Sequence, residues 1–171
     1  MAFLQCASHL PGAMPVSPLP EPLTIGWKEY LDLPDLGVLR IKTKIDTGAR
    51  TSTLHVDSFT VLEELPDGTG LAEVVVSPDR RRPDERVTAR VRVLRYLTVR
   101  DSGGHPEVRP LIETEMVLGT VRKRIRLTLT DRSGMLFRMI LGRKALEGSF
   151  RVDVARKYRL RRSKREKPGE E

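Results

Sequence analysis

The chain has 171 residues, of which 39% are hydrophobic and 32% charged, with a net charge of +8 and one cysteine. This length suits one domain with a buried core. No apolar run reaches the roughly 20 residues that cross a bilayer, so we expect no membrane association. A single cysteine excludes an intrachain disulfide, which favours a reducing, cytoplasmic location.

The two ends differ in composition from the middle of the chain. Residues 1–22 contain five prolines and lack the pattern of a signal peptide, so we expect a disordered leader. From Arg156 onward there are eight basic residues and three glutamates, which together carry +5 of the net charge. We expect residues 161–171 to form a basic flexible tail, since such blocks are most often solvated, with binding to nucleic acid or an acidic partner as the alternative.

Residues 23–160 are predicted to form one all-β domain. Alternation of apolar and other residues is clearest over Val87–Val99, with a period of two rather than 3.6. One short helix is expected over Arg143–Glu147, closed by Gly148. Many short strands separated by turns indicate a barrel or a sandwich. The extended segments expected are 24–27, 38–45, 51–61, 71–76, 87–99, 108–118, 121–130, 135–141 and 150–154.

The most informative motif is Asp46-Thr47-Gly48-Ala49, which follows an extended run that begins at Ile41. A strand that delivers one carboxylate into a tight Thr-Gly turn can present a catalytic acid. Much later in the chain comes Ile140–Arg143, two apolar residues followed by Gly-Arg. Asp and Gly are also common in ordinary β-turns, but the second segment favours the catalytic interpretation.

Together these two segments resemble the retropepsin-like aspartic peptidases. In that family the apolar strand crosses beneath the Asp-Thr-Gly loop, a short helix follows the Gly-Arg, and a hairpin flap falls where this chain has Asp101–Glu107. The resemblance is closest to a bacterial family labelled ATP-dependent zinc proteases, which is associated with ATP-grasp ligases of the RimK kind that add glutamate. It covers residues 23–160, through the blocks Ile25–Trp27, Lys44–Ser52, Gly104-His105, Arg109-Pro110, Leu127–Ser133 and Phe137–Arg143.

The resemblance implies a closed retropepsin-like barrel and an aspartic peptidase site. Such a site needs two facing carboxylates that share one proton. With one convincing copy per chain, we expect a homodimer that places Asp46 against its own copy. Thr47 would brace the loop, and Gly48 would let the substrate backbone approach.

The expected flap supplies further candidate residues. Gly103, Gly104 and His105 are predicted to contact substrate from its tip. Asp101-Ser102-Gly103 is also a candidate for a second half-site. No second apolar-apolar-Gly segment pairs with it, however, so a hairpin turn is the favoured interpretation.

Three basic residues depart from the retropepsin pattern. Lys44 lies two residues before Asp46, and Arg50 follows Ala49, where retropepsins typically carry an Asp that pairs with the Arg of Gly-Arg. Here Arg143 would face Arg50, unless a carboxylate such as Asp131 intervenes. We predict that Lys44, Ala49, Arg50 and Arg143 line the substrate site and favour acidic, glutamate-rich peptides. The alternative is that these cations point to solvent or form structural pairs.

The sequence therefore predicts an aspartic-type peptide hydrolase with a functional link to an ATP-grasp glutamate ligase. Two alternatives stay open: a non-catalytic module that holds acidic peptide tails, and a basic β-barrel that binds nucleic acid. No cofactor or metal is expected. The chain has neither a Gly-x-x-x-x-Gly-Lys-Ser/Thr nor a His-Glu-x-x-His motif. His9, His55 and His105 are far apart, with His55 expected at a strand end near the active loop.

Overall fold

The computed structural model describes residues 21–100 and 104–160, which form a closed six-stranded barrel with one short helix. This confirms the all-β retropepsin-like fold. The order around the barrel is β2 (Lys28–Leu33), β3 (Val38–Asp46), β10 (Met139–Gly142), β4 (Ser52–His55), β9 (Val121–Thr130) and β8 (Pro106–Leu118). An antiparallel bridge between Asp32 and Val117 joins β8 back to β2 and closes the ring.

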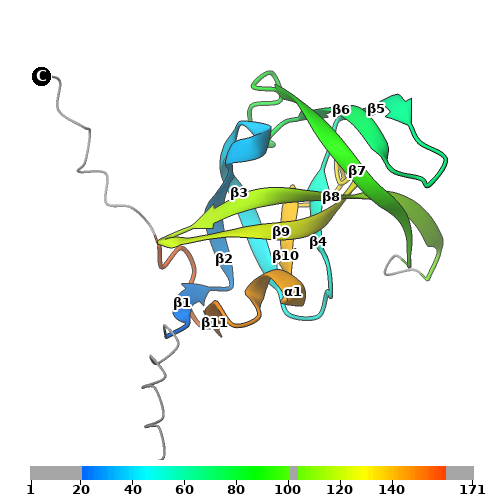
Figure 1. Ribbon diagram of the computed structural model, residues 1–171. Helices are drawn as coiled ribbons and strands as arrows, with labels where there is room; N and C mark the ends of the chain where they lie inside the picture. The colour runs from blue at the N-terminus through cyan, green and yellow to red at the C-terminus, as the bar shows by residue number, and fades with distance from the viewer. Residues whose placement is uncertain (1–20, 101–103, 161–171) are drawn as a thin grey trace, which may run out of the picture.

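The remaining elements extend this barrel in two directions. The sheet continues from β8 through β7 (Val87–Arg100) and β6 (Gly70–Val76) to β5 (Ser58–Glu64). A parallel pair, β1 (Leu23–Gly26) with β11 (Phe150–Asp153), lies at the other end with α1 (Arg143–Leu146), while η1 (Pro34–Leu36) joins β2 to β3. In Figure 1 the β7–β8 hairpin projects from the barrel at the right, and the loop from β3 to β4 lies beside α1.

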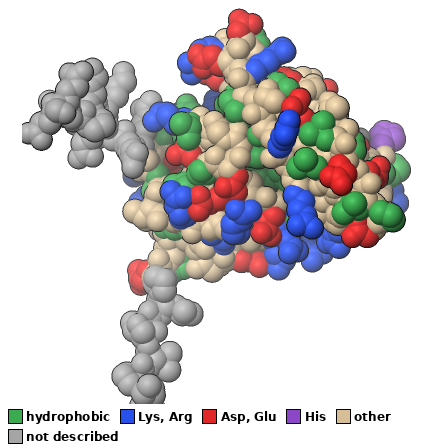
Figure 2. All heavy atoms as spheres, turned by 45° about the horizontal axis from the view of Figure 1, so that its top comes forward, with side chains coloured by type: hydrophobic (Ala, Val, Ile, Leu, Met, Phe, Trp, Pro, Cys, Tyr) green, Lys and Arg blue, Asp and Glu red, His purple; other side chains and the backbone are tan. Residues whose placement is uncertain are grey.

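Aliphatic side chains build the core, as the low aromatic content requires. Leu31, Ile41, Leu54, Ile112 and Leu127 come from five different barrel strands and are at most 1% exposed. Full burial of each such side chain contributes about 1.5–3 kcal/mol to the stability of the fold. The surface is charged instead, and Figure 2 shows Lys and Arg interspersed with Asp and Glu over one face. Among the described residues, no helix has the length and apolarity that a membrane span requires.

The structure corrects three local expectations. Residues 28–33, not expected as a strand, form β2. The segment 51–61 is two strands rather than one, because the chain leaves β4 at His55 and enters β5 at Ser58. The apolar run 135–141 is extended only from Met139 onward, and Leu136 remains 65% exposed.

The other expectations have mixed outcomes. The short helix is confirmed over Arg143–Leu146, and Gly148 follows it at φ 70°. The predicted leader, apart from its last two residues, and the predicted tail lie outside the described residues.

Candidate functional site

The loop after β3 fixes the carboxylate of Asp46 in one orientation. Its Oδ1 accepts hydrogen bonds from the backbone N–H groups of Gly48 (3.0 Å) and Ala49 (3.1 Å). The side chain nevertheless remains 26% exposed. The turn therefore presents a fixed carboxylate that solvent or a substrate can still reach.

Strand β10 passes directly beside this loop, as the sequence predicts. Gly142 is in register with Asp46 on the parallel neighbour β3, and its N–H donates to Ser52 Oγ at 3.1 Å. A Cβ at Gly142 would lie 2.7 Å from the carbonyl carbon of Thr51 and 3.0 Å from the carbonyl oxygen of Ala49. Only glycine fits such a close approach between two backbones.

Arg143 holds the loop from the other side. Its Nη1 donates to the carbonyl oxygens of Thr47 (3.0 Å) and Gly48 (2.9 Å), and its backbone N–H donates to Ala49 O at 2.8 Å. Arg143 was expected to face Arg50, but its guanidinium group donates hydrogen bonds to loop carbonyl oxygens instead. Whether Arg143 also contacts substrate stays a prediction.

The other two cations of the motif differ in their contacts. Lys44 Nζ lies 3.7 Å from Asp46 Oδ2, with the Lys44 side chain 47% exposed. Such an exposed ion pair contributes little to stability, about 0–1 kcal/mol. Arg50 is exposed as well, and its carbonyl oxygen accepts a hydrogen bond from Lys144 N at 3.1 Å. Of these two cations, Lys44 is therefore the one in direct contact with the candidate carboxylate.

Arg132, which was not expected at the site, lies within electrostatic range of Asp46, and Arg109 lies within electrostatic range of Arg132. Burial lowers the pKa of Arg132, the positive charge of Arg109 adds to this, and the negative charge of Asp46 opposes it. Arg109 is held by Glu107 through bonds of 2.8 and 2.6 Å, and Glu107 in turn accepts a bond from Thr130. Both arginines lie in sequence blocks that carry the family resemblance, so that resemblance was the available signal.

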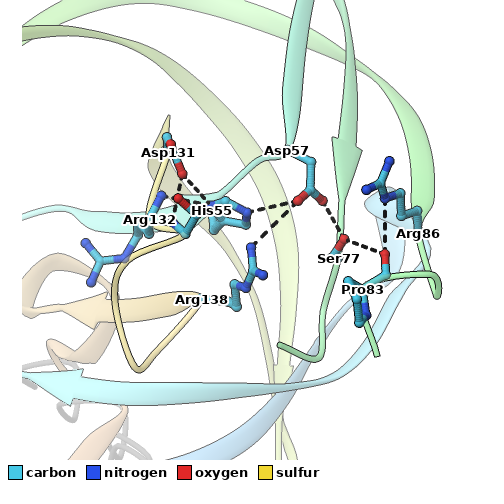
Figure 3. A network of polar contacts seen from close by, with 9 residues as sticks. His55, Asp57, Ser77, Pro83, Arg86, Asp131, Arg132 and Arg138 are labelled. Carbon is cyan, nitrogen blue, oxygen red and sulfur yellow. Dashed lines mark hydrogen bonds and ion pairs between the residues drawn. The ribbon is translucent and has the colours of Figure 1, made fainter. Parts of the chain in front are cut away.

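His55 anchors the backbone of Arg132. It is buried at the end of β4, where its Nδ1 accepts a hydrogen bond from the backbone N–H of Arg132 at 2.8 Å. The ring proton must then be on Nε2, which lies 3.2 Å from Asp57 Oδ1. Ser77 Oγ donates to the other oxygen of Asp57 at 2.5 Å, completing the network in Figure 3.

The pKa values of this network are shifted by its burial and its hydrogen bonds. Burial lowers the pKa of His55, against the opposing effect of its hydrogen bond to Asp57. Burial acts to raise the pKa of Asp57, but the hydrogen bonds from Ser77 and His55 outweigh it and the pKa is lowered. Neutral His55 facing ionised Asp57 is the resulting state. Within the described residues, no group of three or more His, Cys, Asp and Glu is placed to hold a metal ion.

The expected flap is the β7–β8 hairpin. Its strands remain paired out to Arg100 and Pro106. Gly104 has φ 83° and its carbonyl accepts a bond from Arg100 Nη1 at 3.1 Å. His105 is exposed, while Gly103 and the rejected half-site Asp101-Ser102 lie outside the described residues. The roles of Gly103, Gly104 and His105 in substrate binding stay predictions.

Comparisons with known proteins agree with this geometry. A family model described as "Retropepsin-like aspartic endopeptidase RimB" matches residues 24–163. A probable alpha-L-glutamate ligase from Parasynechococcus marenigrum is 34% identical over 138 residues, which are 81% of this chain and 29% of that protein. A second, from Desulfotalea psychrophila, is 34% identical over 133 residues, 77% of this chain and 28% of that protein. The chain thus corresponds to a minor part of each ligase.

A solved structure supports the fold independently. A protein of unknown function from Legionella pneumophila superposes with a TM-score of 0.67 at 23% identity, over 81% of this chain and 98% of that one. The family match covers most of the chain and includes both the Asp46 loop and the β10 segment that crosses it. The chain therefore belongs to the RimB-like family of retropepsin-like aspartic endopeptidases.

Proposed function

We propose that the protein is a peptide hydrolase that uses Asp46 as one half of an aspartic catalytic pair. The observation that carries this proposal is the Asp46 carboxylate, fixed by two backbone N–H groups yet open to solvent. An Asp46 from a second chain would complete the pair in a cytoplasmic homodimer. Thr47, which is exposed at the loop in the single chain, would brace the two loops against each other.

The two carboxylates would then divide the chemistry between them. Like charges at short range cannot both ionise, so one carboxyl keeps its proton while the other is ionised. The ionised one takes a proton from the attacking water, and the protonated one donates to the scissile carbonyl oxygen. Gly48 leaves room beside Asp46, because a Cβ there would lie 3.3 Å from the Asp46 Oδ1. No group outside the protein and water is needed for these steps.

The substrate we propose is an acidic, glutamate-rich peptide. Lys44 lies against Asp46, Arg132 is held within its electrostatic range, and Arg50 is exposed on the same loop. Ammonium and guanidinium groups pair with carboxylates. The relatives named probable alpha-L-glutamate ligase support a functional link to a glutamate-adding enzyme.

Substitution of Asp46 tests the catalytic role. The purified protein should cleave an oligo-glutamate peptide faster than a length-matched apolar peptide, as followed by mass spectrometry. Asp46→Asn should lower kcat/KM by at least about 10³-fold while leaving the melting temperature nearly unchanged. Asp67→Asn is a matched control, since Asp67 Oδ1 also accepts a bond from the N–H two residues on but lies in another turn. Retained activity of Asp46→Asn, or a preference for the apolar peptide, would contradict the proposal.

One observation favours a second function, a module that holds acidic tails without cutting them. The Lys44–Asp46 ion pair places a cation beside the carboxylate, where it could also pair with the carboxylates of a bound acidic tail. Tight binding of the oligo-glutamate peptide without hydrolysis, from acidic to neutral pH, would support this second function.

A further inference from the structure

A pocket of about 940 Å³ lies between the β2–β3 hairpin and the loop that joins β6 to β7. Seven Lys or Arg residues line it, against two acidic residues, Asp79 and Glu85. Asp46 is not among the lining residues. We call this cavity the basic pocket. Its charge makes it a place where an anion would gain favourable interactions with several guanidinium groups.

The acidic residues of the basic pocket do not neutralise it. Arg82 alone engages both of them, with Nε 3.3 Å from Asp79 and Nη1 2.7 Å from Glu85. Asp79 and Glu85 therefore both form their ion pairs with Arg82, one of the seven cations. The other basic residues of the lining, among them Arg81 and Arg86, leave a surplus of positive charge.

Arg138 is the most telling member of the lining. Its residue surface is 9% exposed, and its Nη1 lies 3.7 Å from Asp57 Oδ1, which is longer than a hydrogen bond. Asp57 is already engaged by His55 and Ser77 (Figure 3). Arg138 Nε and Nη1 are buried, and neither has a hydrogen-bond partner among the described residues. A buried guanidinium in this state gains when an anion supplies the missing acceptors.

The wall of the basic pocket is held in an unusual backbone conformation. Among the described residues, Arg40 (φ 55°) and Tyr158 (φ 53°) are the two non-glycine residues with positive φ, and both line the pocket. Tyr30 stacks on Tyr158 at a centroid distance of 5.0 Å, and the Arg40 guanidinium lies 5.4 Å from the Tyr30 ring. Strain of this kind tends to be kept where it organises a binding site.

Strand β3 connects the basic pocket to the candidate site. Lys42, Lys44 and Asp46 alternate with the buried residues Thr43 and Ile45, so their side chains share the accessible face of the strand. Lys42 lines the pocket and Lys44 contacts Asp46. Four residues of extended chain span about 13 Å. A peptide that runs along this face would therefore pass from Asp46 to the pocket within a few residues.

We propose that the basic pocket is a second binding subsite, which holds the carboxylates of an acidic polypeptide several residues away from the bond next to Asp46. This inference rests on the proposed function, because it takes the acidic peptide as the occupant. The row of Lys42 and Lys44, which leads to Asp46, favours a polypeptide over a small phosphate anion. The subsite predicts that affinity depends on peptide length, because only a peptide that reaches from the Asp46 loop to the basic pocket can occupy both.

Binding measurements on Asp46→Asn protein test the subsite without turnover. Fluorescent peptides of five and of twelve glutamates are titrated against Asp46→Asn, against the same protein with Lys42→Gln and Arg81→Gln, and against a control with Arg90→Gln and Arg92→Gln. The control pair is exposed on β7 and lies outside the pocket lining. The pocket variant should bind the twelve-residue peptide about tenfold more weakly. Binding of the five-residue peptide, and both affinities of the control, should stay within about twofold.

Three outcomes would overturn the subsite. The first is unchanged affinity of the pocket variant for the long peptide, and the second is an equal loss for the control variant. The third is a tenfold loss of pyrophosphate affinity in the pocket variant with unchanged affinity for the long peptide, which would assign the pocket to phosphate anions. Cleavage of the five-residue peptide by the unsubstituted protein tests the proposed function separately. Its absence, together with pocket-dependent binding of the long peptide, would reject catalysis and keep the subsite.

Discussion

The Asp46 loop and the basic pocket are built in opposite ways. In the loop, backbone N–H groups within four residues bond the Asp46 carboxylate, and a neighbouring strand and the Arg143 side chain hold the backbone of the turn. The pocket is assembled from separate segments: the β2–β3 hairpin, the loop after β6 and the segment before β10. A site that must place one carboxylate accurately uses backbone, whereas a site that attracts extended negative charge can use side chains from many places.

The His55–Asp57 network lies between these two regions. On one side, His55 holds the backbone of Arg132, whose charge interacts with Asp46. On the other side, Asp57 lies beside Arg138 of the pocket. The two regions are therefore linked through one pair, the buried His55 and the more exposed Asp57 (Figure 3). Substitutions in the loop, in the pocket and in this pair should differ in how much they change the free energy of unfolding.

The largest effect is expected at the strand crossing below the loop. Gly142→Ala would put a Cβ 2.7 Å from the Thr51 backbone, and backbone cannot move aside cheaply. We expect the free energy of unfolding to fall by about 3 kcal/mol or more, as measured by urea denaturation. Gly134→Ala is the control, since a Cβ there meets nothing within 4 Å. A loss below about 1 kcal/mol at Gly142 would show that the loop is less rigid than its contacts indicate.

Removal of the Arg143 side chain should have a smaller effect, confined to the loop. Arg143→Met deletes two hydrogen bonds to the carbonyl oxygens of Thr47 and Gly48 but keeps much of the side-chain volume. We expect a stability loss of about 1–2 kcal/mol and a larger loss in peptide cleavage than in binding of the twelve-glutamate peptide. Lys144→Met, which removes an exposed pair with Glu147, should cost about 0.5 kcal/mol or less. If Arg143→Met and Lys144→Met changed stability and cleavage equally, Arg143 would have no special role in positioning the loop.

The loop was predictable from sequence because its parts are local. Asp46–Ala49 is contiguous, and the partner strand at Gly142 carries its own short motif, so a family resemblance could join them. The pocket has no such motif. Arg40, Arg81 and Arg138 are three of 31 Lys and Arg residues, and only the tertiary fold shows which of these share a cavity.

Strand β2 shows a second reason why prediction from sequence was incomplete. Its sequence Lys-Glu-Tyr-Leu-Asp-Leu carries three charges, yet Glu29 is 1% exposed. The Glu29 carboxylate accepts hydrogen bonds from the N–H groups of Gly26 (2.7 Å) and Arg159 (2.8 Å). The second of these donors lies 130 residues away in the chain. A buried charge is tolerated when such partners satisfy it, and partners so distant leave no local signal.

The link between loop and pocket should respond to acid. Because burial lowers the pKa of His55 below its usual 6.5, the unfolded chain takes up a proton below about pH 6.5 that the folded chain excludes. The free energy of unfolding should therefore fall as the pH drops below that value, by at most about 1.4 kcal/mol per pH unit from this group. Asp57 acts in a lower window. Its pKa lies below the usual 3.8, so its contribution is present above that pH and is lost as the pH falls further.

Urea denaturation between pH 7 and pH 5 checks the sign of the His55 effect. His55→Gln should be less stable at pH 7 but should show a flatter dependence on pH over this range. His105→Gln is the comparison variant at an exposed histidine. If the free energy of unfolding of His55→Gln still fell with pH as steeply, the titrating group would be a residue other than His55.

The smallest change in stability is expected for Arg40→Gly. This substitution tests whether the strained backbone at Arg40 serves peptide binding. Glycine adopts positive φ without steric cost, so Arg40→Gly relieves the strained wall at φ 55°. We expect a gain of a few tenths to about 1 kcal/mol in the free energy of unfolding. Affinity for the twelve-glutamate peptide should fall at the same time, because the Arg40 cation is lost from the pocket. Leu39→Gly, at an exposed neighbour without positive φ, should lose about 0.5–1 kcal/mol instead. If Arg40→Gly raises the free energy of unfolding but weakens peptide binding, the strained backbone serves the pocket. If the substitution lowers the free energy of unfolding, the contacts of Arg40 with Tyr30 outweigh the cost of its backbone conformation.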